Sequence, residues 1–118
     1  MLSHMAKHSV SLDPIFHALA DPTRRAIIHR LGRGAATVSE LAKPFNMALP
    51  SFMKHVGVLE RSRLIVSRKT GRVRTCELQR KNLLAAQRWF DEQRDHWQDR
   101  FSNLDGLLAK LSGDENDS

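Results

Sequence analysis

Residues 49–78 read LPSFMKHVGVLERSRLIVSRKTGRVRTCEL, and the hydrophobic period changes within this stretch. The first part spaces its apolar residues three or four apart, which predicts an amphipathic helix from Leu49 to about Ser62. The second part predicts two strands, Ile65–Lys69 and Arg72–Leu78, joined at Thr70-Gly71 in a compact hairpin. The apolar positions that we expect to face the core from the helix are Leu49, Phe52, Val56 and Leu59.

Shorter patterns upstream predict the helices that precede this stretch. Asp13 and Asp21 are each followed by proline, and a capping carboxylate followed by a residue without an N–H group is typical of a helix start. We expect the second of these helices to stop at Gly32. Thr37 and Glu40 form a capping-box pattern at the start of a third, short helix. That helix, the longer one after it and the hairpin predict a mainly α fold with a small β-hairpin, a winged helix-turn-helix.

From Asn82 onward the pattern is again that of a helix. Its apolar residues recur every seven positions from Leu83 to Leu111, and a stripe this regular requires a partner helix. Either it packs against the chain's own first helix, PIFHALA (residues 14–20), or it binds a second copy of the chain with that first helix contributing. The predicted dimer-interface residues are Phe16, Leu83, Phe90, Trp97, Phe101, Leu104, Leu108 and Leu111.

These patterns divide the chain into four parts. We expect a flexible leader in residues 1–10, which are polar and aperiodic, and a winged helix-turn-helix domain in residues 11–81. A long C-terminal dimerisation helix should occupy residues 82–112, and a disordered acidic tail residues 113–118.

Positive charge is concentrated in the first two thirds of the chain. The 118 residues include 19 Lys and Arg against 13 Asp and Glu, a net charge of +6. Residues 1–81 hold 15 basic and 5 acidic residues, a net of +10, whereas residues 82–118 hold 4 and 8, a net of −4. This basic domain fits a polyanionic partner, and a helix-turn-helix typically binds double-stranded DNA. No apolar run reaches the ~18 residues that span a bilayer and no signal-peptide pattern is present, so we expect a cytoplasmic, nucleoid-associated protein without a membrane partner.

The helix from Leu49 and the hairpin supply the candidate DNA contacts. Ser51, Met53 and Lys54 lie away from the apolar stripe, where a recognition helix presents side chains to base edges. His55 borders the stripe, so it either packs half-buried or contacts a phosphate. The charged hairpin is either a solvated edge that discourages aggregation or a wing that contacts phosphates. The predicted contacts are Ser51, Met53, Lys54 and His55 on the recognition helix and Arg68, Lys69, Arg72 and Arg74 on the wing.

Two single residues leave alternatives open. Gly57 costs about 1 kcal/mol relative to alanine inside a helix and is either tolerated or permits close approach of a backbone. Cys76, the one cysteine, is favoured as a small core-facing residue over a reactive sensor thiol. The sequence has no nucleophile motif, glycine-rich loop or clustered histidines, so we expect no enzyme activity, no cofactor and no metal site.

The segments ALADPTRRAIIHRL (18–31), TVSELAKPFNMALPSFMKHVGVLERSRLI (37–65) and SRKTGRVRTCEL (67–78) together resemble the ArsR family of bacterial winged helix-turn-helix transcriptional regulators. The resemblance implies a homodimer, built from the first and last helices, that usually represses operator-promoter DNA. Metal-sensing members carry a Cys-x-Cys-type motif on the short helix or an Asp/His/Glu set on the last helix. Neither is present here, so the resemblance implies the non-metal "ADPTRR" branch, with a small-molecule effector possible but unidentified.

Three departures from the family pattern bear on base readout. Ala48 stands where a serine commonly caps the recognition helix, which forfeits about 1 kcal/mol. Met53 replaces a frequent serine and Gly57 a frequent lysine.

An alternative function from another class is that of a protein-interaction adaptor, which keeps the winged fold and binds a different protein through its last helix. If the chain instead pairs with itself, two recognition helices should meet half-sites roughly 34 Å apart, one turn of duplex.

Overall fold

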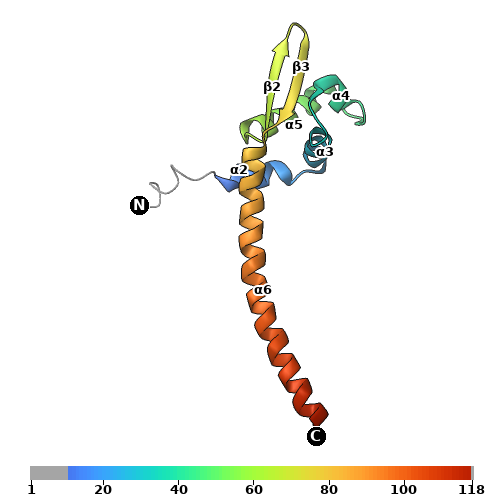
Figure 1. Cartoon of the computed structure of the whole chain (residues 1–118). Helices are drawn as coiled ribbons and strands as arrows, with labels where there is room; N and C mark the ends of the chain where they lie inside the picture. The colour runs from blue at the N-terminus through green and yellow to red at the C-terminus, as the bar shows by residue number, and fades with distance from the viewer. Residues whose placement is uncertain (1–10, 118) are drawn as a thin grey trace. The chain divides into compact units, whose positions relative to one another are not determined.

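The computed structural model describes residues 11–117 and the side chains of residues 11–112 (Figure 1). The described residues as far as Ala86 form one compact unit, and those from Gln87 onward form a second. In chain order the elements are α2 (Leu12–Leu19), α3 (Pro22–Leu31), β1 (Ala36–Thr37), α4 (Val38–Ala42), α5 (Leu49–Arg61), β2 (Ile65–Thr70), β3 (Val73–Leu78) and α6 (Arg80–Asp117).

The first unit confirms the predicted fold class. α4 and α5 form the helix-turn-helix, and β2 and β3 form the wing, which extends beyond the helices of this unit in Figure 1. The predicted leader, residues 1–10, lies outside the described residues. No side chain is described in the predicted tail, residues 113–118, so the tail also stays a prediction.

The two Asp-Pro pairs begin their helices differently. The Asp21 carboxylate accepts a hydrogen bond of 3.0 Å from the backbone N–H of Arg24, and Pro22 is the first residue of α3, as predicted. The expectation for Asp13 is wrong, because Ser11 occupies the N-cap position of α2. Asp13 instead lies in the first turn of α2, where its negative charge interacts favourably with the positive end of the helix dipole.

The helix-turn-helix begins with the predicted cap. The backbone N–H of Glu40 donates to Thr37 Oγ1 over 3.1 Å, which satisfies one of the unpaired donors at the start of α4. At the start of α5 the N-cap position is held by Ala48, which offers no side-chain acceptor. The first turn of α5 therefore lacks the side-chain hydrogen bond that caps the first turn of α4.

A third strand joins the predicted hairpin. The strand order is β1-β3-β2, all antiparallel, with Ala36 opposite Cys76 and Thr37 opposite Thr75. β2 and β3 pair from Ile65 opposite Leu78 to Thr70 opposite Val73, which leaves the loop at Gly71 and Arg72, one residue later than predicted. Gly71 has φ 62°, a left-handed conformation that glycine adopts without steric cost.

The core of the first unit lies between the helices and the sheet. From α5 it receives Phe52, Val56 and Leu59, as predicted, but not Leu49, whose side chain is 58% exposed. The expectation that Leu49 faces the core is therefore wrong. Leu49 is the first residue of α5, and the first buried residue of this helix is Phe52. The buried hydrophobic cluster consists of Ile15, Ala18, Ile27, Leu31, Ala36, Leu41, Phe52, Val56, Leu59, Leu64, Ile65, Cys76 and Ala86.

Cys76 is fully buried in this cluster, which confirms the core-facing reading. Burial raises the pKa of its thiol, and the nearby Glu60 carboxylate adds to this, while Arg74 partly opposes it. Because the thiolate is the reactive form, both the burial and the raised pKa make this thiol unreactive near neutral pH.

The first turns of α6, as far as Ala86, belong to the first unit. Ala86 is buried and Leu83 packs against the core cluster, as does Phe16 of α2. The side-chain amide of Asn82 donates to the backbone oxygen of Arg63 over 2.9 Å, and Arg63 has φ 61°. This bond holds the left-handed turn between α5 and β2. Own-chain packing thus explains the start of the seven-residue stripe.

The rest of the stripe is exposed in this single chain. Phe90, Trp97, Phe101, Leu104, Leu108 and Leu111 have exposed fractions between 49% and 60%. None of the described helices combines the length and the apolar character needed to cross a membrane.

Candidate nucleic-acid interface

The side of α5 away from the core carries the residues predicted to contact bases. Ser51 and Lys54 are exposed, and Met53 is half-buried at the edge of the core cluster. The N-terminal half of α5 therefore offers a hydroxyl, a thioether and an ammonium group to a partner.

The four predicted wing cations do not share one face. Lys69 lies directly opposite Arg74 in the β2–β3 register, so the two side chains share a face of the hairpin. Arg68 is the neighbour of Lys69 along β2 and therefore points to the other face. Arg72 lies in the loop at the tip, and the guanidinium of Arg74 approaches the Glu60 carboxylate of α5 to 4.0 Å. Lys69 and Arg74 thus share one face of the wing, Arg68 lies on the opposite face, and Arg72 lies at the tip.

An open hollow of about 620 Å³ lies between the N-terminal ends of α4 and α5 and the wing. It brings three wing cations together with one predicted base-contacting residue, Met53. The other four predicted DNA contacts, Ser51, Lys54, His55 and Arg68, do not line it. The lining residues are Thr37, Val38, Ser39, Leu49, Met53, Lys69, Arg72, Val73 and Arg74.

Sequence reasoning missed several members of this hollow. Ser39 is the exposed second residue of α4, and Leu49 and Val73 are exposed apolar residues at the ends of α5 and β3. One signal was available: Leu49 lies four residues before Met53, so the two share a side of α5. The hydroxyl of Ser39 could be found only once α4 was placed beside the wing.

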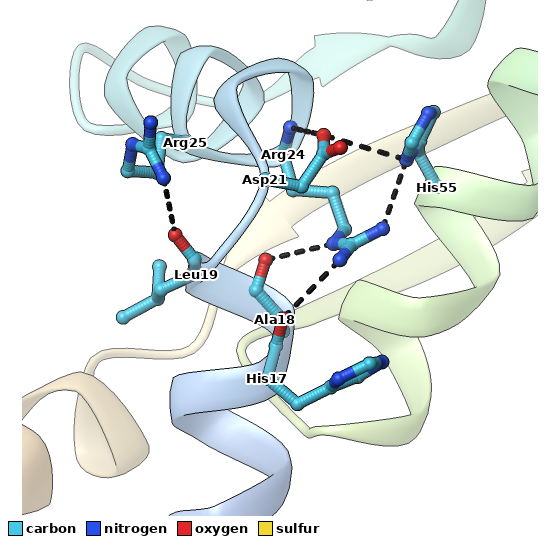
Figure 2. A network of polar contacts seen from close by, with 7 residues as sticks. All are labelled: His17, Ala18, Leu19, Asp21, Arg24, Arg25 and His55. Carbon is cyan, nitrogen blue, oxygen red and sulfur yellow. Dashed lines mark hydrogen bonds and ion pairs between the residues drawn. The ribbon is translucent and has the colours of Figure 1, made fainter.

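His55 does not line the hollow and instead belongs to a network with Asp21 and Arg24 (Figure 2). Arg24 Nη1 lies 3.0 Å from His55 Nδ1, and Asp21 Oδ2 lies 3.6 Å from the same nitrogen. Because arginine can only donate, Nδ1 accepts this hydrogen bond when the ring proton is on Nε2. A protonated His55 would instead direct its Nδ1–H to the Asp21 carboxylate.

The network also sets the protonation of Asp21. Burial by itself would raise the pKa of this carboxyl group. The hydrogen bond from the backbone N–H of Arg24 and the electrostatic interactions with His55 and Arg24 outweigh burial, so the pKa of Asp21 lies below its usual value. Asp21 therefore serves as a charged cap of α3 and as a counter-ion beside the recognition helix.

Comparisons with known proteins agree with this arrangement. Residues 19–68 match a protein family described as a helix-turn-helix domain. The HTH-type transcriptional regulator Rv2034 of Mycobacterium tuberculosis is 40% identical over 75 residues, which cover 64% of this chain and 70% of that protein. The transcriptional repressor SdpR of Bacillus subtilis is 33% identical over 60 residues, which cover 51% of this chain and 67% of that protein. A crystal structure of an ArsR family transcriptional regulator matches with a TM-score of 0.71 and 59% identity, covering 74% of this chain and 90% of that one.

The fold and the basic hollow beside α5 define a winged helix-turn-helix DNA-binding protein. The relatives narrow this class, and the chain belongs to the ArsR family of transcriptional regulators. The family resemblance seen in the sequence is confirmed, and with it a function in DNA-binding transcriptional regulation. Among the residues whose side chains are described, no three His, Cys, Asp or Glu residues are arranged to hold a metal ion.

Proposed function

We propose that this chain is a homodimeric repressor that binds operator DNA with α5 in the major groove and the wing along the phosphate backbone. The observation that supports this most strongly is the hollow, which places Lys69, Arg72 and Arg74 beside the N-terminal half of α5. Cations at a wing neutralise phosphates whatever the sequence, whereas side chains of a recognition helix reach base edges. The two kinds of contact are therefore available side by side.

The exposed residues of α5 suit different tasks in the groove. Lys54 is exposed and carries the charge that favours the O6 and N7 acceptors of guanine, while the hydroxyl of Ser51 can donate or accept. His55 uses Nδ1 within its own chain, which leaves Nε2 as the group it can offer to a phosphate. We therefore assign His55 first to positioning α5 and only second to contacting DNA.

The exposed stripe of α6 supports the dimer. Trp97, Phe101 and Leu104 are each about half exposed in the single chain, and apolar residues with coiled-coil spacing are stabilised by a facing helix. A second copy of the chain supplies an identical stripe. Leu83 and Phe16 already pack on their own core and would contribute only their exposed edges.

Repression, location and the absence of a metal complete the proposal. The Bacillus subtilis relative is named as a repressor, and we extend that activity to this chain. We place the protein in the cytoplasm on nucleoid DNA, in the metal-free branch of the family, with no enzyme activity.

Two substitutions test the proposed contacts on a promoter fragment selected from the source genome. Lys54→Ala should lower the preference for that fragment over random DNA by roughly tenfold, because a lost base contact costs 1–3 kcal/mol. Arg72→Ala should weaken binding to all duplexes alike and reduce the slope of affinity against salt by about one phosphate contact. Unchanged binding by the doubly substituted protein would refute the site.

A further inference from the structure

Four apolar side chains, Val38, Leu49, Met53 and Val73, line the hollow that faces DNA in the proposed function. Leu49 is 58% exposed and Val73 is 51% exposed, and both line the hollow together with Met53. Leu49 and Met53 are one turn apart on the same side of α5. A single exposed leucine is ordinary, but apolar side chains collected in one hollow indicate a surface that binds something.

The charges around these side chains restrict what that partner can be. Lys69, Arg72 and Arg74 line the same hollow, and none of its lining residues is acidic. A partner must therefore carry negative charge at the rim and an apolar group between the charges. Duplex DNA has both, because the 5-methyl group of thymine projects into the major groove between the two phosphate backbones.

We propose that Leu49 and Met53 recognise thymine through its 5-methyl group, with Val73 closing the hollow from the wing. This inference rests on the proposed function, since it requires α5 to lie in the major groove. It gives a task to Leu49, an exposed apolar residue that the fold does not need. It also predicts that each half-site contains a T·A pair facing the first turns of α5, whatever other bases are read by Lys54 and Ser51.

Deoxyuridine provides the direct test, because uracil has the hydrogen-bonding edge of thymine and lacks only the methyl group. The full-length protein is first used to select duplexes from a randomised pool. Each thymine of a selected duplex is then replaced in turn by deoxyuridine, and the dissociation constant is measured. Replacement at a contacted thymine should weaken binding about fourfold, the effect of one buried methyl group, and replacement at other thymines should have no effect.

Two variants connect the methyl group to the named residues. In Leu49→Ala and in Met53→Ala, the affinity ratio between the thymine and deoxyuridine duplexes should fall from about four toward one. Arg72→Ala is the matched control, because Arg72 lines the same hollow but contacts phosphate. It should weaken both duplexes equally and keep the ratio. Leu49→Ala changes an exposed side chain, so it gives the result even if Met53→Ala impairs folding.

The outcomes separate this inference from the proposed function. Equal binding of thymine and deoxyuridine duplexes at every position overturns thymine recognition, although DNA binding stands. A ratio that persists in both variants assigns the methyl contact to other residues and also overturns the inference. If the protein retains no duplex from the pool, the proposed function itself is wrong, and the inference is wrong with it.

Discussion

Arg24 Nη1 lies 3.0 Å from His55 Nδ1, so a side chain of α3 contacts the recognition helix directly. The same guanidinium donates from Nε to the Ala18 oxygen over 2.7 Å and from Nη2 to the His17 oxygen over 3.2 Å. These two carbonyl groups belong to the C-terminal end of α2, and the His17 oxygen also accepts a hydrogen bond from the backbone N–H of Ala20 over 3.2 Å. One arginine thus contacts α2 and α5 from α3, and it meets α5 near the middle of that helix (Figure 2).

Arg24→Ala should lower the free energy of unfolding by about 2 kcal/mol, because hydrogen bonds to a charged donor are worth about 1.5–3 kcal/mol when half-buried. Arg24→Lys should recover little, since one ammonium group cannot reach three acceptors in a fixed fork. Urea denaturation at neutral pH measures both changes. Operator affinity should fall as well, because α5 loses a contact that fixes its position.

The neighbouring arginine supplies a matched control. Arg25 Nη1 donates to the Leu19 oxygen over 2.8 Å, but this bond is exposed, so Arg25→Ala should cost less than about 1 kcal/mol. A double-mutant cycle between Arg24→Ala and His55→Ala should give a coupling energy of about 1 kcal/mol. A coupling energy near zero would show that the contact does not stabilise the protein.

Substitutions at Asp21 should give a stability change that depends on pH. Asp21→Ala should cost about 1 kcal/mol at neutral pH, because α3 loses its capping acceptor. Asp21→Ser keeps an oxygen for the backbone N–H of Arg24 and removes only the charge that interacts with Arg24 and His55.

The sign of this pH dependence follows from the lowered pKa of Asp21. Folding favours its carboxylate form, so the stabilisation is complete above the unfolded-state pKa of about 3.9 and is lost as pH falls through the lower folded-state pKa. The difference in unfolding free energy between the wild-type protein and Asp21→Ser should therefore shrink below about pH 4. Thermal denaturation between pH 3 and 7 tests this, and a difference that widens in acid would contradict it.

Local patterns predicted those parts of the fold that depend on neighbours in sequence. The caps at Asp21 and Thr37 and the period of α5 involve residues three or four positions apart, and the structure confirms them. β1 has only two residues, too few for a pattern, and exists because β3 offers it a partner. Leu49 has the right spacing for the core, but a helix end lacks the neighbours that would cover it.

The candidate site was predictable only in part for the same reason. The basic residues of the wing were visible in the sequence, and alternation along β2 separates Arg68 from Lys69 once the register is known. The contact between Arg24 and His55 joins residues 31 positions apart, so no local spacing indicates it. Likewise, the hollow exists only where α4, α5 and the wing meet.

Gly57→Ala should stabilise the protein by about 0.5–1 kcal/mol, because alanine loses less conformational entropy than glycine inside a helix. A methyl group at this position would lie 3.1 Å from Arg61 Nη1, the end of a flexible side chain, and its three nearest neighbours outside the helix backbone all belong to that side chain. Of the two explanations for Gly57, toleration is therefore favoured over close approach of a backbone.

Gly71→Ala is the contrasting substitution. Nothing lies within 4 Å of an added methyl group there, but φ is 62°, so alanine should destabilise the wing turn by about 1 kcal/mol. Chemical denaturation of both variants compares a glycine in a regular helix with one in a left-handed turn. Destabilisation by Gly57→Ala would mean that Arg61 cannot move aside.

Leu104→Asp should convert the proposed dimer to a monomer, because it places a charge in the middle of the exposed stripe of α6, where pairing with a second copy would bury it. Sedimentation equilibrium measures the mass of the full-length protein. Ser102→Asp adds the same charge on another face of the helix and should leave the mass unchanged. Operator affinity should fall in Leu104→Asp alone, since a monomer binds one half-site at a time.

A dimeric mass for Leu104→Asp would contradict this interface. A wild-type monomer that associates only with a helix of another protein would favour the adaptor function instead.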